Sequence, residues 1–474
     1  MLSDDHVAQI HDEALRMLQD HGIKVLLPEA RRIFADGGAA VDHDDAMVRI
    51  PSEVVQAAMA LAPSSFDIAA RNRSRNMTLG ANSLVFTPAA GPPYASDLER
   101  GRRPGTLDDF ENFVRLSQSF DVVHSLAPAV EAQDVPINIR HLVTTRSMVS
   151  LSDKALFAYS RGRRILADVF EMARIAHGVS VEEFQSTPHC WTNINTNSPR
   201  QLDIPMSLGI IDSARAGQAC VMTPFTLAGA MAPVSLAGAL LLQHTELLAA
   251  VTLSQLARPG APVVYGAFTS NVDMRSGSPA FGTPEAMKGA IASGQLARHV
   301  NLPWRSSGSS TSNTEDAQAG YETMINTYGA VLGGSNMIIH AAGWQEGGLC
   351  ASFEKFILDV EMLQMIAELF SPIDMHTDEL AFDIIAAVPP GGHFFGTEHT
   401  LARYEHAFYE PLVFTRQNFG QWTENGSTTA TQRANGVKNR MLSSFEPPAL
   451  DSGIAAELDD FMNRRIAEGG AAPD

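Results

Sequence analysis

The feature that most constrains this chain is a regular alternation of short apolar runs and longer amphipathic stretches, which begins near residue 83. Each short run predicts a buried strand, and each stretch with apolar residues three and four apart predicts a helix. The expected strands are 84–87, 122–126, 155–159, 190–193, 219–223, 263–266, 304–307 and 337–341. The expected helices are 107–118, 136–151, 162–177, 203–216, 237–257, 284–299, 315–332 and 352–370. Eight strand–helix units in a row favour an α/β fold of the (β/α)₈ TIM barrel type over an open doubly wound sheet.

The sequence on either side of these units has a different texture. Residues 1–82 predict an N-terminal α+β extension, in which a helix over 4–21 ends at Gly22 and a hairpin covers 66–80. The barrel itself would span 83–370, and residues 371–474 predict a mainly helical C-terminal extension that packs on it. No glycine-rich dinucleotide or phosphate motif follows a strand, so the nucleotide-binding α/β folds lack their fingerprints here.

The charge balance narrows the possible partners. The chain has 34 Lys and Arg against 53 Asp and Glu, a net charge of −19, which argues against a nucleic-acid partner. Charged residues make up only 18%, below the roughly 25% usual for soluble domains. We therefore expect other protein to cover much of the surface, as in a homo-oligomer or a complex.

The cysteines and the uncharged segments indicate the compartment. Cys190, Cys220 and Cys350 lie far apart and fit a reducing cytoplasm, and the acidic N-terminus does not resemble a signal peptide. The uncharged stretch 216–245 is long enough to span a bilayer, but prolines and glycines interrupt it. A buried strand, a loop and a buried helix explain it better, so we expect no membrane association.

In a barrel, the loops that follow the strands carry the active site. The segments directly after the strands are 88–94, 128–131, 193–198, 224–226, 267–271, 308–313 and 344–348. They are rich in hydroxyl, amide and aromatic side chains, and their only acidic residues are Glu131 and Glu346. An uncharged mouth of this kind argues against phosphorylated substrates and against a metal bound directly by the chain, whereas aromatic faces bind quaternary ammonium groups. The candidate substrate-binding residues are Tyr94, Glu131, Phe225, Phe268, Ser310, Trp344 and Gln345, and Glu346 is the candidate catalytic residue.

Several of these candidates have an ordinary structural explanation. Tyr94 could simply pack its loop, Phe225 and Phe268 are more commonly core or rim residues, and the Ser/Thr run 306–312 could be a flexible loop. The Trp344–Gly348 segment is the stronger indication, because adjacent glycines at a strand end allow close backbone approach.

Two further possibilities stay open. His393, in a Gly-Gly-His-Phe turn, is either a satisfied turn histidine or a partner contact. Glu131 and Glu346 could also form the carboxylate pair of a glycoside hydrolase, which needs two carboxylates on either side of one bond.

Two long motifs resemble a known family. The first is Asp316-Ala-Gln-Ala-Gly-Tyr-Glu322 followed by Asn336-Met-Ile-Ile-His-Ala-Ala-Gly-Trp-Gln-Glu-Gly-Gly348, and the second is Pro390-Gly-Gly-His-Phe-Phe-Gly-Thr-Glu-His-Thr400. Together with Ala14-Leu-Arg-Met-Leu18 they resemble the trimethylamine methyltransferase superfamily, the corrinoid-dependent methyltransferases of methylated amines. The resemblance runs from about residue 5 to residue 465.

The resemblance implies a (β/α)₈ barrel that moves a methyl group from a methylated amine to Co(I) of a corrinoid (cobalamin) carried by a separate protein. His393 and Phe394, in the second motif, are then expected to bind that cofactor. The archaeal trimethylamine enzymes carry pyrrolysine, whereas all 474 positions here are standard residues. The equivalent position would fall in 308–313 or 342–346. Members without pyrrolysine are associated with quaternary amines such as glycine betaine, so we expect a glycine betaine-like substrate. The alternatives are a betaine-binding barrel without activity and the two-carboxylate hydrolase.

Overall fold

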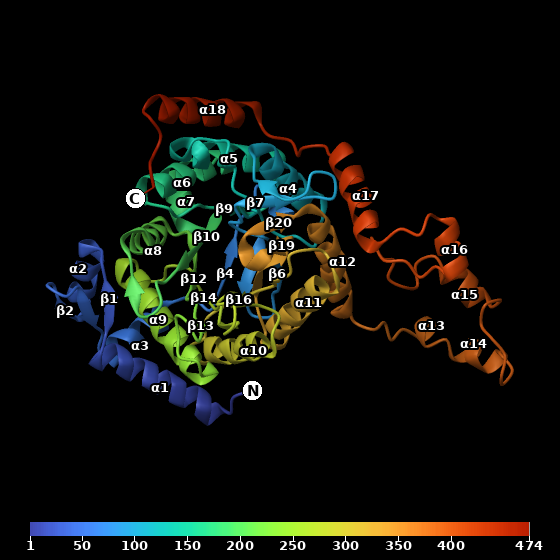
Figure 1. Ribbon diagram of the computed structural model, residues 1–474, viewed down its shortest axis with the longest axis horizontal. Helices are drawn as coiled ribbons and strands as arrows, with labels where there is room; N and C mark the ends of the chain where they lie inside the picture. Colours follow the sequence, from blue (N-terminus) through green and yellow to red (C-terminus); the bar gives the residue numbers. More distant parts are fainter. Residues whose placement is uncertain (474) are drawn as a thin grey trace.

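The computed structural model describes residues 1–473, and its centre is a curled sheet of seven parallel strands surrounded by helices (Figure 1). In spatial order the strands are β6 (Val85–Pro88), β18 (Met337–Ala342), β17 (Trp304–Ser307), β14 (Val263–Gly266), β12 (Ala219–Thr223), β10 (Cys190–Asn195) and β9 (Leu156–Phe157). Strand β6, the first strand of this sheet along the chain, pairs with β18, the last. The strand order therefore matches that of a barrel rather than that of a doubly wound sheet. Seven of the predicted strands are thereby confirmed, although β9 is shorter than expected.

The predicted strand 122–126 is wrong as a regular strand. Only Ser125 forms a bridge, to Ala155 beside β9. The amide of His124 donates to the carbonyl of Phe86 in β6 at 2.9 Å, while the Phe86 amide donates to Nδ1 of the His124 ring at 3.1 Å. The side chain of His124 therefore takes a ladder position that a main-chain carbonyl would fill in a strand.

All eight predicted helices around the sheet are present. They are α4 (Leu107–Ser119), α5 (Ile137–Leu151), α6 (Arg163–His177), α8 (Ile204–Ala216), α9 (Leu236–Ala257), α10 (Pro284–His299), α11 (Ala317–Leu332) and α12 (Phe353–Leu369), with a short extra helix α7 (Val181–Ser186). Side-chain oxygens of Asp203, Thr283 and Asp316 cap the first turns of α8, α10 and α11, which explains where these helices begin.

The uncharged stretch divides as predicted into strand β12, a loop and helix α9. Helix α9 is long and apolar enough to cross a membrane, yet 72% of its most apolar window is buried inside the protein. It packs against α8, α10 and the N-terminal helices α1 (Asp4–Asp20) and α3 (Ser52–Leu61). The apolarity of α9 therefore reflects its place in the core.

The N-terminal residues attach at two places to the body formed by the curled sheet and its helices. A small sheet of β2 (Ala40–Asp42), β3 (Met47–Arg49) and β1 (Ile23–Val25) continues into β11 (Gln201–Leu202), and α2 (Pro28–Asp36) lies beside it. The predicted hairpin is present as β4 (Ser65–Ile68) and β5 (Met77–Gly80), linked by the short helix η1 (Arg73–Arg75). Its buried side chains Ile68, Met77 and Leu79 join the apolar cluster inside the curled sheet.

The loops that follow the strands form two small sheets that the sequence did not indicate. One contains β13 (Leu227–Ala228), β15 (Ser270–Val272) and β16 (Pro279–Ala280). The other contains β7 (Tyr94–Ser96), β8 (Arg103–Pro104), β19 (Trp344–Gln345) and β20 (Cys350–Ser352), with η2 (Glu346–Gly348) between the last two. These sheets give the loops of the candidate site a fixed backbone.

The C-terminal residues have two structural roles. Residues 371–428, here termed the arm, carry the short helices α13 (Thr377–Leu380), α14 (Phe382–Ala387), α15 (Glu398–Arg403) and α16 (Phe419–Glu424), which project away from the body (Figure 1). The arm touches the body near Val413, which is buried and whose amide donates to Glu361 of α12. The chain then returns, and α17 (Ala430–Ser443) packs on α12 while α18 (Ser452–Ala467) packs on α6.

Candidate active site

A cavity of about 470 Å³ lies where the parallel strands end, within the range usual for small-molecule sites. We call it the mouth cavity. Seven aromatic side chains line it: Phe157, Tyr159, Trp191, Phe225, Phe268, Phe281 and Trp344. Its polar side chains are Ser160, Arg161, Asn193, Asn195, Thr223, Arg305 and His340. No Asp or Glu of the described chain is among the lining residues.

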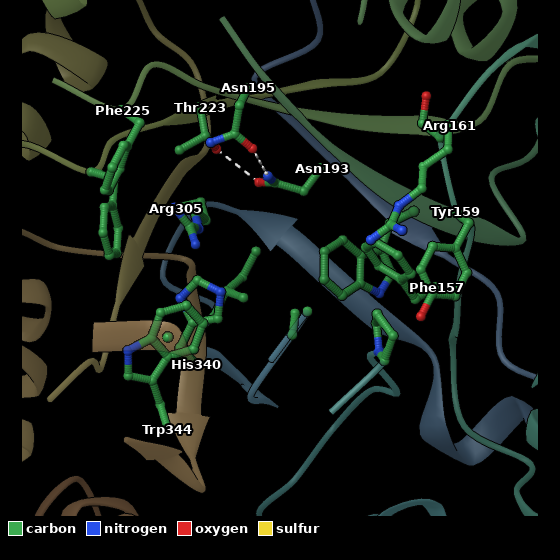
Figure 2. Close-up of a pocket in the computed structure, with 18 of the residues that line it drawn as sticks. Phe157, Tyr159, Arg161, Asn193, Asn195, Thr223, Phe225, Arg305, His340 and Trp344 are labelled. Atoms are coloured by element: carbon green, nitrogen blue, oxygen red, sulfur yellow. Dashed lines mark hydrogen bonds between the residues drawn. The ribbon is translucent and has the colours of Figure 1, made fainter. Parts of the chain in front are cut away.

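The aromatic side chains form two groups that face each other across the cavity (Figure 2). On one side Phe225 stacks on Phe268 with ring centroids 5.0 Å apart, and Phe281 meets Phe268 edge-on at 4.9 Å. On the other side Phe157 lies edge-on to Trp191 at 4.8 Å. Rings on both sides can contact a small cation that enters between them.

His340 enters the cavity because strand β18 is irregular there. Its backbone has φ of +60° within a register shift between Ile338 and Ala342. The ring contacts Trp344, with centroids 3.8 Å apart, and Nδ1 lies 2.8 Å from the hydroxyl of Ser307. Burial, and then the nearby Arg305 cation, hold the pKa of His340 well below its usual value, so the imidazole is neutral at pH 7.

Arg305 occupies an inward position on β17. Its neighbour Trp304 points the other way, into the core cluster shared with the helices, as strand alternation requires. Arg305 is 1% exposed, and burial lowers the pKa of its guanidinium to about 9. The prediction that the mouth of the barrel is uncharged is therefore wrong, because the side chains of Arg305 and Arg161 bring positive charge into the cavity lining.

Polar groups on β10 and β12 form a short hydrogen-bonded row at the cavity edge (Figure 2). The Thr223 hydroxyl donates to Oδ1 of Asn193 at 2.8 Å, and Nδ2 of Asn193 donates to Oδ1 of Asn195 at 2.9 Å. These bonds orient the two amides without any charged group.

Three of the predicted substrate-binding residues line the mouth cavity, namely Phe225, Phe268 and Trp344. The turn before Trp344 is held from helix α12, because the Gly343 amide donates to Asp359 at 2.9 Å and the same carboxylate pairs with Lys355 at 2.6 Å. A buried, paired carboxylate is a firm anchor for such a turn.

Other predicted residues lie beside the cavity but not in its lining. The guanidinium of Arg102 covers the Tyr94 ring at 3.7 Å and binds the Glu346 carboxylate at 2.9 Å. Gln345 is buried, and its Nε2 has no hydrogen-bond partner. The loop of Glu346 does reach the cavity, through Gly347 and Gly348.

The remaining predicted residues have other partners. The Glu131 carboxylate binds Arg161 at 2.6 Å and Arg140 at 3.4 Å. The Ser310 hydroxyl donates to the Glu322 carboxylate at 2.8 Å, and Glu322 also accepts the amides of residues 311 and 312, so it orders this loop. His393 and Phe394 lie in the arm between α14 and α15, and the structure does not bring them to the mouth cavity of the same chain.

The sequence did not identify six of the charged or aromatic lining residues, namely Phe157, Tyr159, Arg161, Trp191, Phe281 and Arg305. Trp191 and Arg305 lie within strands β10 and β17, and not in the loops where a barrel is expected to carry its site. A lone arginine inside an otherwise uncharged strand was the available signal for Arg305, because a charged group rarely takes a buried strand position without a purpose. Over residues 1–473, no group of three His, Cys, Asp or Glu side chains is placed to hold a metal ion.

The parallel sheet with an aromatic cavity at its strand ends defines a barrel-type α/β enzyme that acts on a small molecule. The family model described as trimethylamine methyltransferase (MTTB) matches residues 1–470. The chain belongs to the trimethylamine methyltransferase family, and it is a methyltransferase.

Individual members of this family are similar to this chain over nearly its whole length. A glycine betaine methyltransferase of Desulfitobacterium hafniense (strain Y51) is 36% identical, over 99% of this chain and 98% of that protein. The trimethylamine methyltransferase MttB of Desulfitobacterium hafniense (strain DSM 10664 / DCB-2) is 31% identical, over 99% of this chain and 95% of its own. The crystal structure of the Methanosarcina barkeri monomethylamine methyltransferase (MtmB) matches with a TM-score of 0.52 at 11% identity, over 96% of this chain and 93% of that one. This last likeness supports the fold alone.

Proposed function

We propose that this protein transfers a methyl group from a quaternary amine of the glycine betaine type to Co(I) of a corrinoid carried by a separate protein. The observation that carries the proposal is the mouth cavity, with seven aromatic side chains and no carboxylate in its described lining. The full-length similarity to a glycine betaine methyltransferase supports the same substrate class.

The chemistry of this transfer suits such a cavity. The C–N bond breaks, its electron pair stays on nitrogen as a neutral tertiary amine, and the methyl cation equivalent is taken by Co(I), which becomes methyl-Co(III). Since the leaving amine is neutral, no general acid is required. A carboxylate beside the ammonium would stabilise the ground state more than the transition state, because the positive charge on nitrogen disappears as the methyl leaves. Aromatic faces attract the cation more weakly than a carboxylate does, so they hold and desolvate it with a smaller penalty.

The proposed residue roles follow from position. Phe225, Phe268 and Trp344 contact the ammonium methyl groups, and neutral His340 supports the Trp344 ring. Glu346 acts as a positioning residue, because its carboxylate holds Arg102 while its loop forms part of the cavity rim. The hydrolase alternative receives no support, since arginines occupy both Glu131 and Glu346.

We also infer that the sheet closes into a (β/α)₈ barrel. The segment 122–126 fills the eighth place, as its amides donate to β6 through Phe86 and to Ala155 beside β9. A closed barrel has one open face at the strand ends, where the corrinoid protein would have to dock to reach the methyl group. The three free cysteines are buried, in keeping with a reducing cytoplasm.

The exposed apolar side chains of the arm support the proposal that the protein forms a homo-oligomer. Twelve of its large apolar side chains are exposed: Ile373, Met375, Leu380, Phe382, Ile385, Phe394, Phe395, Leu401, Tyr404, Phe408, Phe414 and Phe419. Apolar surface on this scale needs permanent cover, whereas a corrinoid protein that must leave after each transfer fits a smaller and more polar contact. A second copy of the chain is therefore the proposed partner of the arm.

An anaerobic assay with excess free cob(I)alamin tests the function. Glycine betaine, proline betaine, carnitine, choline and trimethylamine are compared, and methylcobalamin formation is followed by absorbance. We expect methylation with glycine betaine and little with trimethylamine. Absence of methylation with every compound would contradict the proposal, and tight betaine binding in that case would favour a binding protein without activity.

A further inference from the structure

Arg305 is a buried cation without a carboxylate partner. Its closest polar contact is marginal, with Nη1 3.5 Å from the carbonyl of Ala267, and Nε has no hydrogen-bond partner. The other groups that face it are the Phe268 ring, 5.6 Å from Cζ, and the neutral imidazole of His340. Burial alone accounts for the lowered pKa of its guanidinium, and no described acidic side chain opposes that effect.

Among the described residues, Arg305 is the only arginine that is fully buried. Arginines that are less buried have firmer partners, as when Arg71 donates to the carbonyls of Val149 and Ser152 at 3.0 and 2.9 Å. Arg103 binds Asp97 and Asp109, and Arg465 binds Asp168. Arg161, on the same cavity, binds Glu131 at 2.6 Å. Arg305 therefore combines full burial with a single marginal polar contact. An uncompensated buried charge is costly, and such a charge facing a cavity indicates that a ligand anion completes it.

We propose that the Arg305 guanidinium binds the carboxylate of the substrate, so that the site selects zwitterionic betaines over methylated amines that lack an acid group. The inference rests on the proposed function and specifies its substrate class. A guanidinium presents a planar pair of N–H donors that matches a carboxylate, and the surrounding Phe225, Phe268 and Trp344 rings face the ammonium end.

The kinetic consequence distinguishes an anchor from a group that acts on the reacting bond. The carboxylate charge is the same in the ground state and in the transition state, whereas the ammonium charge disappears. The contact with Arg305 is therefore uniform binding, which changes KM more than kcat. A side chain that acted on the leaving nitrogen would mainly change kcat.

The test measures binding by calorimetry without any corrinoid, with glycine betaine and choline as ligands, because both carry a trimethylammonium group and only the first carries a carboxylate. We expect Arg305→Met to weaken glycine betaine binding by about 10- to 100-fold, as for lost hydrogen bonds to a charged group, and to leave choline binding unchanged or tighter. Arg305→Lys should recover part of the loss. Arg161→Met serves as the matched control, because that arginine is already paired, and it should have a smaller effect.

Folding of Arg305→Met is checked by its melting temperature, which should equal or exceed that of the parent because an unpaired buried charge has been removed. Equal binding of choline and glycine betaine by the parent protein would overturn the anchor, as would unchanged glycine betaine binding or an unchanged KM in Arg305→Met. Arg305-dependent binding without methyl transfer to cob(I)alamin would instead overturn the proposed function and leave the anchor standing.

Discussion

At the scale of single residues, Trp344 is the side chain on which the proposed site depends most. It lines the mouth cavity, contacts His340 and follows a turn anchored by Asp359. We expect Trp344→Ala to lower the rate of methyl transfer to cob(I)alamin at least tenfold, about 1.4 kcal/mol in the barrier, because the methyl group loses a ring that positions it for attack. Glu346→Gln should have a comparable effect through the loop.

Trp344→Phe is the control, since it keeps a ring at the same place and should retain more activity than Trp344→Ala. Steady-state rates with glycine betaine give the comparison. If Trp344→Ala and Glu346→Gln both transfer methyl groups at the parental rate, neither residue belongs to the site.

The candidate site was partly predictable from the sequence at this scale. Phe225, Phe268 and Trp344 follow strands directly, and the position of a loop after a barrel strand is enough to place them near the cavity. Arg305 lies inside a strand, where its direction depends on the register of the whole sheet. His340 reaches the cavity through a left-handed backbone conformation that no local pattern announces.

At the scale of elements, the strand and helix periods identified most strands of the curled sheet and the helices around it. Apolar runs such as 219–223 and 263–266 form strands at the predicted positions because they are buried on both faces. The segment 122–126 has a similar apolar pattern, but its backbone is set by the bond from the Phe86 amide to the His124 ring. A tertiary hydrogen bond of that kind leaves no periodic trace in the sequence.

A histidine contact between helices predicts that the docking of α1 depends on pH. Nδ1 of His11 on α1 lies 3.0 Å from Nε2 of His244 on α9, and His244 also bonds the Tyr265 hydroxyl. Burial and then the nearby His299 on α10 lower the pKa of His11, whereas Asp12 opposes this; burial and then the other two histidines lower that of His244. Both rings are neutral in the folded protein at pH 7.

Below a pH of about 6.5 the unfolded chain takes up protons on these two histidines, whereas the folded chain does not. The contribution of the two neutral histidines to the free energy of unfolding is therefore fully present above that pH. It should fall as the pH decreases from about 6.5 towards the lower folded pKa values. We expect the melting temperature to drop from pH 7.5 to 5.5, and His11→Asn to reduce that drop. His6→Asn, which changes an exposed histidine of the same helix, should leave it unchanged. An identical pH dependence in His11→Asn and the parent would contradict this account.

At the scale of the whole molecule, the low content of charged residues predicts that other protein covers part of the surface. It does not show which part of the surface is covered. The division of the chain into domains 1–82, 83–370 and 371–474 stays a prediction. One apolar cluster crosses the first of these boundaries, because it joins Leu15 and Phe34 to Leu247 in α9. Sequence periodicity does not reveal which faces of a terminal extension meet the body. The separation of the arm from α17 and α18 therefore emerged only from the tertiary structure (Figure 1).

The exposed phenylalanines of the arm lead to a prediction about the oligomeric state of the protein. Phe382 and Phe408 are 76% and 86% exposed, and such side chains at the centre of an interface contribute strongly to association. We expect the parent protein to elute as an oligomer in size-exclusion chromatography with light scattering, and Phe382→Asp/Phe408→Asp to shift towards the monomer mass of 51.0 kDa. Val181→Asp, at an exposed apolar position on α7, should keep the parental mass. A monomeric parent would contradict the assignment of a second copy to the arm, because its apolar surface would then be uncovered in solution.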